Sequence, residues 1–346
     1  GVWIMAYTVI DKPSDYFNPV LYTGNESTNA ISGIGFQPDW VWLKAKDSGG
    51  VDHFLFDSVR GVQKNIHSNT TDAEVTTSNS LTAFGSDGFT LGSDAYVNGS
   101  GQPHISWNWK AGGTASSNTD GTITSNVSAN TTAGFSIVGW TGTGATATVG
   151  HGLGTTPKLF IVRERSEARN WPIITTGIDG SWDSLYLNLT DVVGNSLQSA
   201  DSSVFNFTSS NEFNASSQTY IAYAFAEVKG YSKMDSYVGN GNANGTFVYT
   251  GFKPAFVFMK NTADSGGNWQ LFDNKRNTYN QMNRRLFPSN SDAENTDANN
   301  NIDFLSNGFK MRTSNGDTNS NGVTFIYYAV ASSPFTTSTG IPTTAR

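Results

Sequence analysis

Three segments, far apart in the 346-residue chain, share one pattern. Each begins with a turn that contains glycine and proline, continues with aromatic and β-branched residues, and carries a cation six residues after the proline. Such a turn followed by such a run is typical of the start of a β-strand. A chain that repeats this unit is expected to repeat one strand of a β-sheet fold. The copies are residues 35–44, 154–163 and 251–260.

The first copy indicates how this strand should lie in its sheet. Alternation along a strand places Trp40, Trp42 and Lys44 on one face, and Val41 and Leu43 on the other. Both faces are bulky, which favours a central strand over an edge strand with one face in water. We expect the same of the two later copies.

Other matched segments follow the proline strand in the same order. Residues 54–60 match 270–276, residues 68–74 match 289–294, and residues 84–89 match 304–309. Each copy closes on an alternating apolar strand, with Ile105, Trp107 and Trp109 in the first, Ile221, Tyr223 and Phe225 in the second, and Ile326, Tyr328 and Val330 in the third. The middle copy lacks the Leu-Phe-Asp segment, and residues 170–173 and then 182–186 stand in its place.

These repeats predict an all-β fold of three homologous antiparallel β-sandwich repeats with a jelly-roll-like topology. Each repeat is long enough to hold a core of its own. No segment has a convincing helical period, and residues 276–286 are the best candidate for a helix. The expected divisions are an N-terminal arm (1–18), repeat 1 (19–113), a Gly/Ser/Thr/Asn-rich linker or β-ribbon (114–133), repeat 2 (134–230), repeat 3 (231–335) and a C-terminal tail (336–346).

Composition argues against several classes of function. The net charge is −7 and no run is rich in lysine or arginine, so we expect no nucleic-acid partner. The chain has no cysteine, and its four histidines lack zinc-ligand spacing, so we expect no disulfide, metal or cofactor. No apolar run reaches transmembrane length, and residues 1–4 are too short and uncharged for a signal peptide. These features favour a protein that is made in a cytoplasm and does not insert into a membrane.

Pairs of aspartate and arginine recur at equivalent places in repeats 1 and 3. With the glutamates that follow, they could form carboxylate pairs of the glycosidase type. The structural alternative is a turn in which aspartate accepts backbone N–H groups and arginine holds the turn in place. We favour the structural interpretation, because a real active site rarely occurs twice in one chain at equivalent places. The residues are Asp57, Arg60 and Glu74, and Asp273, Arg276 and Glu294.

Loops rich in Asn, Asp and Gly offer oxygen atoms that could hold calcium. None of them matches the EF-hand loop with its closing glutamate. The same residues are also the ordinary residues of turns. We favour turns, and the sequence leaves the calcium question open. The loops are residues 240–245, 297–303 and 314–322.

The candidate binding residues lie where the middle copy departs from the other two. Trp171, Trp182 and Tyr186 occur there, with Asp183 beside them. Aromatic rings stack on the faces of sugars, and polar side chains bind sugar hydroxyl groups. We predict a carbohydrate-binding surface from these four residues. Packing in the core is the alternative for each aromatic residue.

Several matched segments carry a resemblance to a known family. The most specific is Leu-Phe-Asp-Ser-Val-Arg-Gly at residues 55–61, and the others are residues 22–25, 35–44, 107–113 and 225–233. From Met5 to Phe335 the chain resembles an uncharacterised domain family that is common in virion proteins of tailed phages of marine bacteria and cyanobacteria. Repeat 3, with Asn274-Lys275, and repeat 2, with its missing segment, depart from the pattern. The family offers no catalytic residues to carry over.

The resemblance implies a virion surface protein. The leading hypothesis is a non-enzymatic tail fibre or receptor-binding protein that contacts host surface glycan. One alternative is a capsid decoration or filament-forming subunit, and another is a glycan depolymerase. We expect other virion proteins as partners, and also copies of this chain in a trimer. Low charge and many aromatic residues would leave apolar surface to cover, and phage fibres commonly trimerise.

Overall fold

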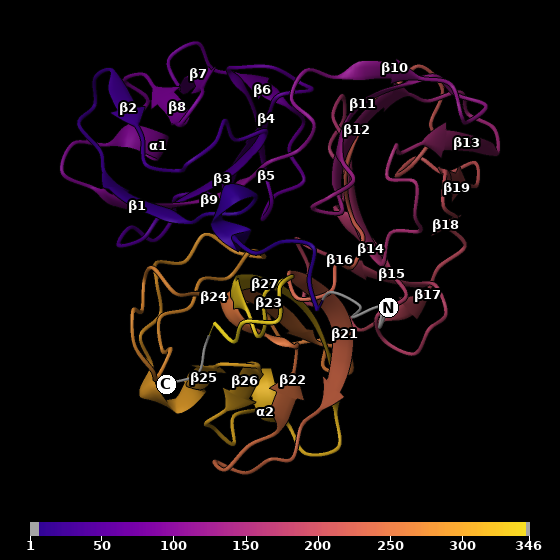
Figure 1. Ribbon diagram of the computed structural model, residues 1–346. Coiled ribbons are helices and arrows are strands. Elements are labelled where there is room, and N and C mark those ends of the chain that lie inside the picture. The colour runs from indigo at the N-terminus through magenta and orange to yellow at the C-terminus, as the bar shows by residue number, and fades with distance from the viewer. Residues whose placement is uncertain (1–6, 344–346) are drawn as a thin grey trace.

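Antiparallel β-sheets, grouped in three lobes, make up residues 7–343, the part of the chain that this computed structural model describes (Figure 1). Lobe 1 holds the strands of residues 20–109, lobe 2 those of 116–225 and lobe 3 those of 232–334. In each lobe a larger sheet lies against a three-stranded sheet, and hydrophobic residues of the two share a core. The prediction of an all-β, sandwich-like fold is confirmed.

The strands follow a related order in the three lobes. The larger sheet of lobe 1 has the order β1 (Val20–Thr23), β9 (Pro103–Trp109), β3 (Trp40–Ala45), β4 (Phe54–Asp57), β5 (Lys64–His67) and β6 (Val75–Thr76), and its small sheet β2 (Asn29–Ile31), β8 (Gly88–Leu91) and β7 (Leu81–Gly85). Lobe 2 has β10 (Ser116–Asn118), β11 (Ser125–Asn130), β12 (Phe135–Thr141), β20 (Thr219–Phe225), β14 (Leu159–Glu164), β15 (Pro172–Thr175), β16 (Asp183–Tyr186) and β17 (Gly194–Asn195), and then β13 (Ala147–Gly150), β19 (Val204–Phe207) and β18 (Ser199–Ala200). Lobe 3 has β21 (Ser232–Val238), β27 (Thr324–Pro334), β23 (Phe252–Asn261) and β24 (Gln270–Asp273), and then β22 (Phe247–Tyr249), β26 (Gly308–Met311) and β25 (Ile302–Leu305).

Each proline segment forms an interior strand, as the sequence predicts. β3 lies between β9 and β4, β14 between β20 and β15, and β23 between β27 and β24. The alternation is also confirmed in β3. Val41 and Leu43 point into the core of lobe 1, whereas Trp40 and Trp42 point to the other face of the sheet.

That other face belongs to a core that the three lobes share. Trp40 of lobe 1 packs against the rings of Tyr223 and Phe225 of lobe 2, at centroid distances of 4.3 and 6.0 Å. Phe256 of lobe 3 packs against Trp109 of lobe 1 at 5.7 Å. One continuous cluster of buried residues includes side chains of all three larger sheets. Burial of apolar area in this cluster therefore stabilises the arrangement of the lobes as well as each lobe.

The cation next to the last residue of each proline strand lies at a boundary between lobes. Lys44, Arg163 and Lys260 are at most 1% exposed. Lys44 Nζ donates to Ser291 O of lobe 3 (3.4 Å), Arg163 donates to Thr71 O of lobe 1 (2.7 Å), and Lys260 Nζ donates to Thr190 O of lobe 2 (3.0 Å).

Each of these cations thus binds a backbone carbonyl of a neighbouring lobe, and the three contacts close a ring. Burial lowers the pKa of Lys44 and of Lys260 to about 8, and that of Arg163 to about 10. Carbonyl oxygens offset part of the cost of burying these charges.

Three buried histidines predict a loss of stability in mild acid. Burial lowers the pKa of His53, His104 and His151 below the usual value near 6.5, so each is neutral in the folded protein. Below pH 6.5 the unfolded chain binds more protons than the folded one, so the free energy of unfolding falls. We expect a loss of at most about 2 kcal/mol between pH 7 and pH 6, the value reached if all three stay neutral. Urea unfolding at the two pH values measures it, and equal midpoints would contradict it.

Residues 114–133, expected as a linker or a β-ribbon, include the antiparallel strands β10 and β11, which continue the larger sheet of lobe 2 beyond β12. Residues 276–286, the best candidate for a helix in the sequence, are not helical. Asn277 Oδ1 accepts the backbone N–H groups of Asn283 and Arg284, so this side chain takes donors that a helix would use. The helices of the described chain are single turns: η1 (Pro13–Asp15), α1 (Ala95–Asn98), η2 (Ala298–Asn300) and α2 (Gly316–Asn319).

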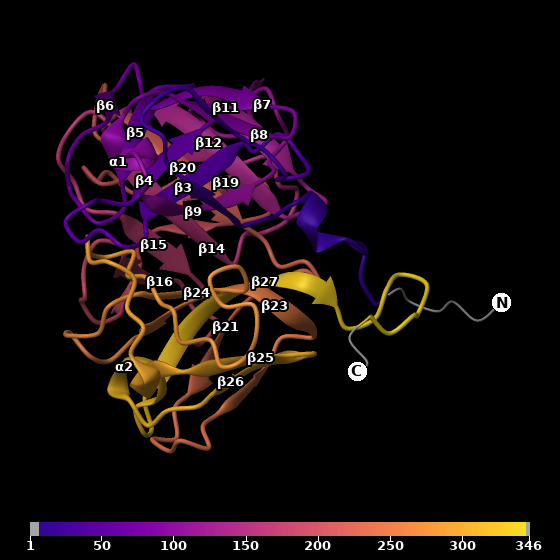
Figure 2. The same ribbon diagram turned by 90° about the vertical axis from the view of Figure 1, so that its left-hand side faces the viewer.

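The N-terminal arm and the C-terminal tail lie beside each other on one side of the molecule (Figure 2). Asp11 accepts the backbone N–H and the hydroxyl of Ser338, both at 2.6 Å. Further along the arm, Phe17 is buried against Trp109 (4.7 Å) and Phe256 (5.3 Å). The arm is therefore packed on its own chain. Residues 1–6 and 344–346, the ends of the predicted arm and tail, lie outside the described residues.

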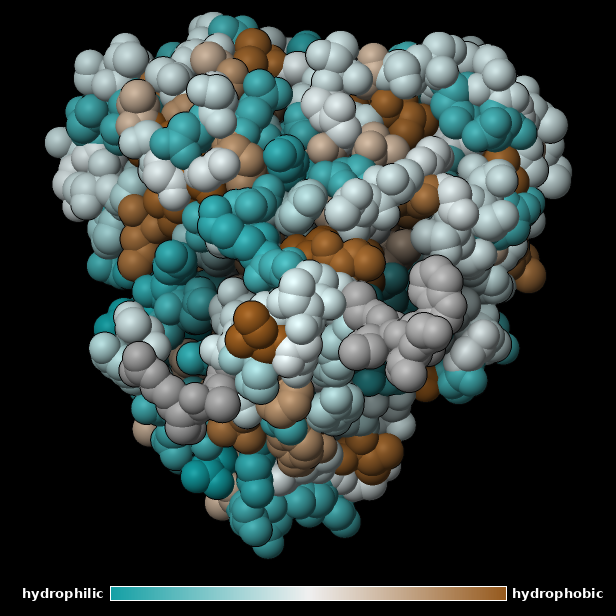
Figure 3. All heavy atoms as spheres, viewed as in Figure 1, coloured by the Kyte–Doolittle hydropathy of each residue, from teal (hydrophilic) through white to brown (hydrophobic). Residues whose placement is uncertain are grey.

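The surface carries little gathered apolar area on the face shown in Figure 3. Polar and neutral side chains cover most of it, and brown patches are small, one of them where the three lobes meet. The aromatic residues of the repeated strands are buried within the chain. The aromatic residues of these strands therefore add little to the outer surface, and the trimer stays a prediction.

Candidate functional site

The four predicted binding residues do not form one exposed surface. Trp171 is fully buried, its Nε1 donates to His67 O (2.8 Å), and the guanidinium of Arg163 lies 5.3 Å from its ring centroid. Its ring is therefore part of the boundary with lobe 1 and is not open to a ligand. Trp171 is thus packed inside the protein, which was the alternative to a binding role.

The other three lie along β16 and the residue before it. Trp182 is half-buried against Phe160 (5.8 Å). Asp183 is 5% exposed, and burial raises its pKa, with the charge of Asp179 acting in the same direction. Tyr186, at the opposite end of β16, donates its hydroxyl to Glu212 (3.1 Å). The strand separates Asp183 from Tyr186, so this segment does not gather them around one ligand.

The first recurring acid–arginine pair fastens lobe 1 to lobe 2. Asp57 accepts the backbone N–H of Arg60 (2.8 Å), forms an ion pair with its guanidinium (2.5 Å), and accepts the hydroxyl of Tyr223 in lobe 2 (2.8 Å). Glu74 joins Arg60 to Arg165 of lobe 2, at 3.1 and 2.8 Å. Burial alone would raise the pKa of Glu74, but the two arginines lower it overall.

The second pair fastens lobe 3 to lobe 1 in the same manner. Asp273 is ion-paired with Arg276 (2.5 Å) and accepts the indole N–H of Trp107 in lobe 1 (3.1 Å). Glu294 pairs with Arg276 (3.2 Å) and Arg284 (2.7 Å). The side chains of the two Asp–Arg pairs, Asp57–Arg60 and Asp273–Arg276, are fully buried, so these two aspartates are held by cations inside the protein.

The Asn- and Asp-rich loops form turns through their own side chains. Asn240 Oδ1 accepts the N–H of Asn242 (3.0 Å), Asp297 Oδ1 that of Asn299 (2.9 Å), and Asn315 Oδ1 that of Asp317 (2.8 Å). Within residues 7–343, no group of three or more His, Asp or Glu side chains is arranged to hold a metal ion. In the same range, no helix has the length and apolar character needed to cross a membrane.

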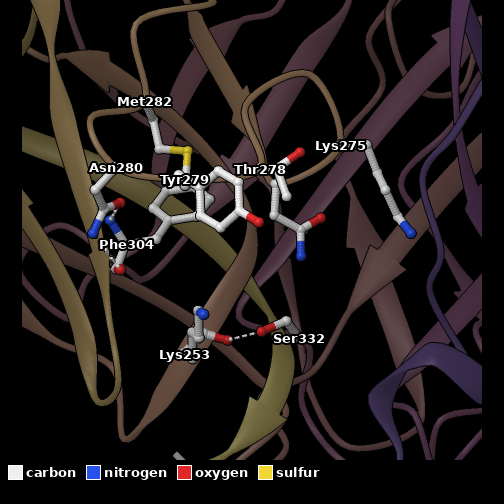
Figure 4. A pocket seen from close by; sticks show the side chains of 9 residues that line it. Lys253, Lys275, Thr278, Tyr279, Asn280, Met282, Phe304 and Ser332 are labelled. Atoms are coloured by element: carbon white, nitrogen blue, oxygen red, sulfur yellow. Dashed lines mark hydrogen bonds between the residues drawn. The ribbon is translucent and has the colours of Figure 1, made fainter. Parts of the chain in front are cut away.

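An open pocket in lobe 3 was not predicted from the sequence (Figure 4). It has a volume of about 430 Å³. Met282 and Phe304, each 3% exposed, supply buried apolar surface, and Tyr279, 82% exposed, also lines the pocket. The polar lining comes from Lys253, Asn274, Lys275, Thr278, Asn280 and Ser332.

The chain around this pocket is held by side-chain hydrogen bonds. Asn280 donates to Phe304 O (3.0 Å) and accepts the N–H of Phe304 (2.9 Å), which ties the Tyr279 segment to β25. Ser332 donates its hydroxyl to Lys253 O (3.1 Å), the dashed line in Figure 4. Figure 4 also shows Tyr279 between Asn280 on one side and Lys275 on the other, with Lys253 and Ser332 below. The pocket thus combines a fixed frame with exposed side chains at its rim.

One sequence signal points to this pocket. In lobe 1 the glutamate of the ion-pair network, Glu74, follows its arginine by 14 positions in the sequence. In lobe 3 Glu294 follows Arg276 by 18 positions. Tyr279 and Asn280 lie in this longer connection. An insertion in one of two matched loops marks a place where function is often carried. The residue pattern of 276–286 by itself indicates only a possible helix.

Comparisons with known proteins give a single result. No curated protein and no solved structure matches the chain. A family model does match, over residues 12–334, and its description is a domain of unknown function, DUF7483. The match spans all three lobes, from the packed arm to the last residue of β27. The chain therefore belongs to the DUF7483 family.

Proposed function

We propose that this chain is a non-enzymatic surface protein of a phage particle, of the tail fibre or receptor-binding type, and that it contacts host surface glycan. The three lobes are, in this proposal, homologous jelly-roll-like sandwiches that have diverged at their outer loops. The phage setting rests on the resemblance described above. Binding of glycan rests on the pocket of lobe 3.

The recurring carboxylates support binding over cleavage. A glycosidase needs two carboxyl groups that face the substrate, one with a raised pKa. Asp57 and Asp273 are fully buried, each ion-paired with its own arginine, and the pKa of Glu74 is lowered. Such groups serve the contacts between lobes and are poor general acids.

The observation that carries the proposal is the exposed Tyr279 beside an apolar base and a polar rim. Sugars present apolar ring faces and many hydroxyl groups, so they suit a shallow site with an aromatic ring and amide, hydroxyl and amine groups. Asn274 lines the pocket, and its side-chain oxygen has no hydrogen-bond partner within the described chain. Weak single sites of this kind gain strength when several copies act together on one surface.

The decoration alternative needs a segment that reaches a neighbouring subunit. Residues 7–17 of the arm are engaged with their own chain, through Tyr7 to Gly251 O (2.6 Å), Asp11 to Ser338 and buried Phe17. This packing favours the adhesive hypothesis over a lattice contact made by that part of the arm.

The test is to incubate the purified protein with cells of marine bacteria and with polysaccharide extracted from them. Retention on cells without any released product supports the proposal. Release of reducing ends or unsaturated sugars would show that the protein is a depolymerase instead. Failure to bind cells of any strain would contradict the adhesive function.

Replacement of Tyr279 by alanine should weaken retention about tenfold, because the ring is the central aromatic contact of the pocket. Melting temperature should not change, since the side chain is 82% exposed. Tyr96→Ala is the matched control: Tyr96 is 61% exposed on α1 of lobe 1, away from the pocket. Equal retention of both variants would mean that the ligand binds elsewhere.

A further inference from the structure

A second hollow continues the pocket of lobe 3. It has a volume of about 650 Å³ and shares Lys253 and Phe304 with the first. Its other lining residues are Leu305, Ser306, Asn307, Ser333 and Thr343. The two hollows together form a groove, called here the lobe 3 groove, that runs past the start of β23 and the end of β27.

The charge of this groove is opposite to that of the protein. The chain carries a net charge of −7, yet among the described residues no carboxylate lines either hollow, and Lys253 and Lys275 contribute two cations. Two other surface lysines are ion-paired, Lys12 with Asp15 and Lys233 with Asp235. Within the described chain, the ammonium groups of Lys253 and Lys275 form no ion pair and no hydrogen bond. They are available to an anionic ligand.

We propose that the lobe 3 groove binds an acidic saccharide, one that bears carboxylate or sulfate groups. This inference rests on the proposed glycan-binding function and narrows its ligand class. The exposed ring of Tyr279 provides surface for a sugar ring, and the amide and hydroxyl groups of the lining provide hydrogen bonds to the sugar's hydroxyls. The two lysines bind its acid groups and are 22 residues apart in the chain, on β23 and on the turn after β24. A free phosphate ion would use the lysines but not the aromatic surface.

The first experiment compares matched ligands by titration calorimetry with the full chain. Oligogalacturonate is compared with its methyl-esterified form, and a sulfated galactan oligosaccharide with its desulfated form. Inorganic phosphate is the arm that tests for simple anion binding. We expect each acidic oligosaccharide to bind about tenfold more tightly than its neutral counterpart at low salt, and this preference to shrink at 0.5 M salt.

The second experiment changes the lysines. Lys253→Gln and Lys275→Gln should each weaken binding of the acidic ligand about threefold to fivefold, and the double variant about tenfold or more, with a clearly smaller loss of binding to the neutral ligand. Lys158→Gln is the matched control, since Lys158 lies in lobe 2 outside the groove. It should leave both affinities unchanged.

The outcomes separate the two proposals. Equal binding of acidic and neutral ligands, with no effect of either lysine, would overturn the acidic preference and leave glycan binding intact. Binding of phosphate as tightly as of the acidic oligosaccharides would overturn the saccharide assignment. No binding of any saccharide, together with no retention on cells, would overturn both.

Discussion

Replacement of Arg60 by methionine should lower the free energy of unfolding by about 3 to 5 kcal/mol, the usual cost of removing one partner of a buried ion pair. The substitution leaves Asp57 inside the protein with a fully buried side chain and no cation. The hydroxyl of Tyr223 and two backbone N–H groups still reach this carboxylate, but they do not balance its charge. Urea unfolding at pH 7, followed by tryptophan fluorescence, measures the change.

Arg312→Met is the matched control. Arg312 pairs with Asp303 at 2.8 Å, but its side chain is 38% exposed. We expect a loss of at most about 1 kcal/mol, as for other surface pairs. If Arg60→Met cost no more than this control, the network between lobes 1 and 2 would be no more important than a surface pair, and the structural interpretation of Asp57 would be in doubt.

Replacement of Trp40 by alanine should also cost about 3 to 5 kcal/mol, through lost burial and the cavity that remains. The indole is 1% exposed and packs on Trp109 (4.3 Å) of its own lobe and on Tyr223 (4.3 Å) of lobe 2. Because the cavity borders two lobes, amide exchange should accelerate in both β3 and β20. Denaturant unfolding gives the free energy, and hydrogen exchange gives its distribution.

Trp182→Ala removes the same side chain from a half-buried place beside Phe160 in lobe 2. Its expected cost is about 1 kcal/mol. Faster exchange in lobe 1 alone after Trp40→Ala would contradict a core that couples the lobes.

The strands of the repeats could be predicted from sequence because their signals are local. A proline turn, bulky residues on both faces and a terminal cation define β3, β14 and β23, and the structure places all three inside their sheets. The turn-forming role of Asp57 and Asp273 was likewise visible, since aspartate three residues before arginine is a local arrangement. These predictions needed no knowledge of distant contacts.

The contacts between lobes could not be predicted in this way. Trp171 has the features of a binding residue in sequence, and only its place at the boundary with lobe 1 makes it a core residue. Lys44 and Lys260 end on the carbonyls of loops that lie far away in the chain. The groove of lobe 3 joins β23, the 277–282 segment, β25 and the end of β27, and no single stretch of sequence contains its chemistry.

The three lobes contact one another in a closed ring and belong to a single chain. This changes which surfaces of the protein have to stay the same. In an oligomer of separate identical subunits, assembly weakens on dilution, and every subunit carries the same outer surface. Here covalent connections keep the lobes together at an effective concentration that dilution does not alter. Each lobe can also alter its outer loops alone while the buried contacts stay fixed. The longer loop that carries Tyr279 in lobe 3, without a counterpart of equal length in lobe 1, is a change of this kind that is confined to one lobe.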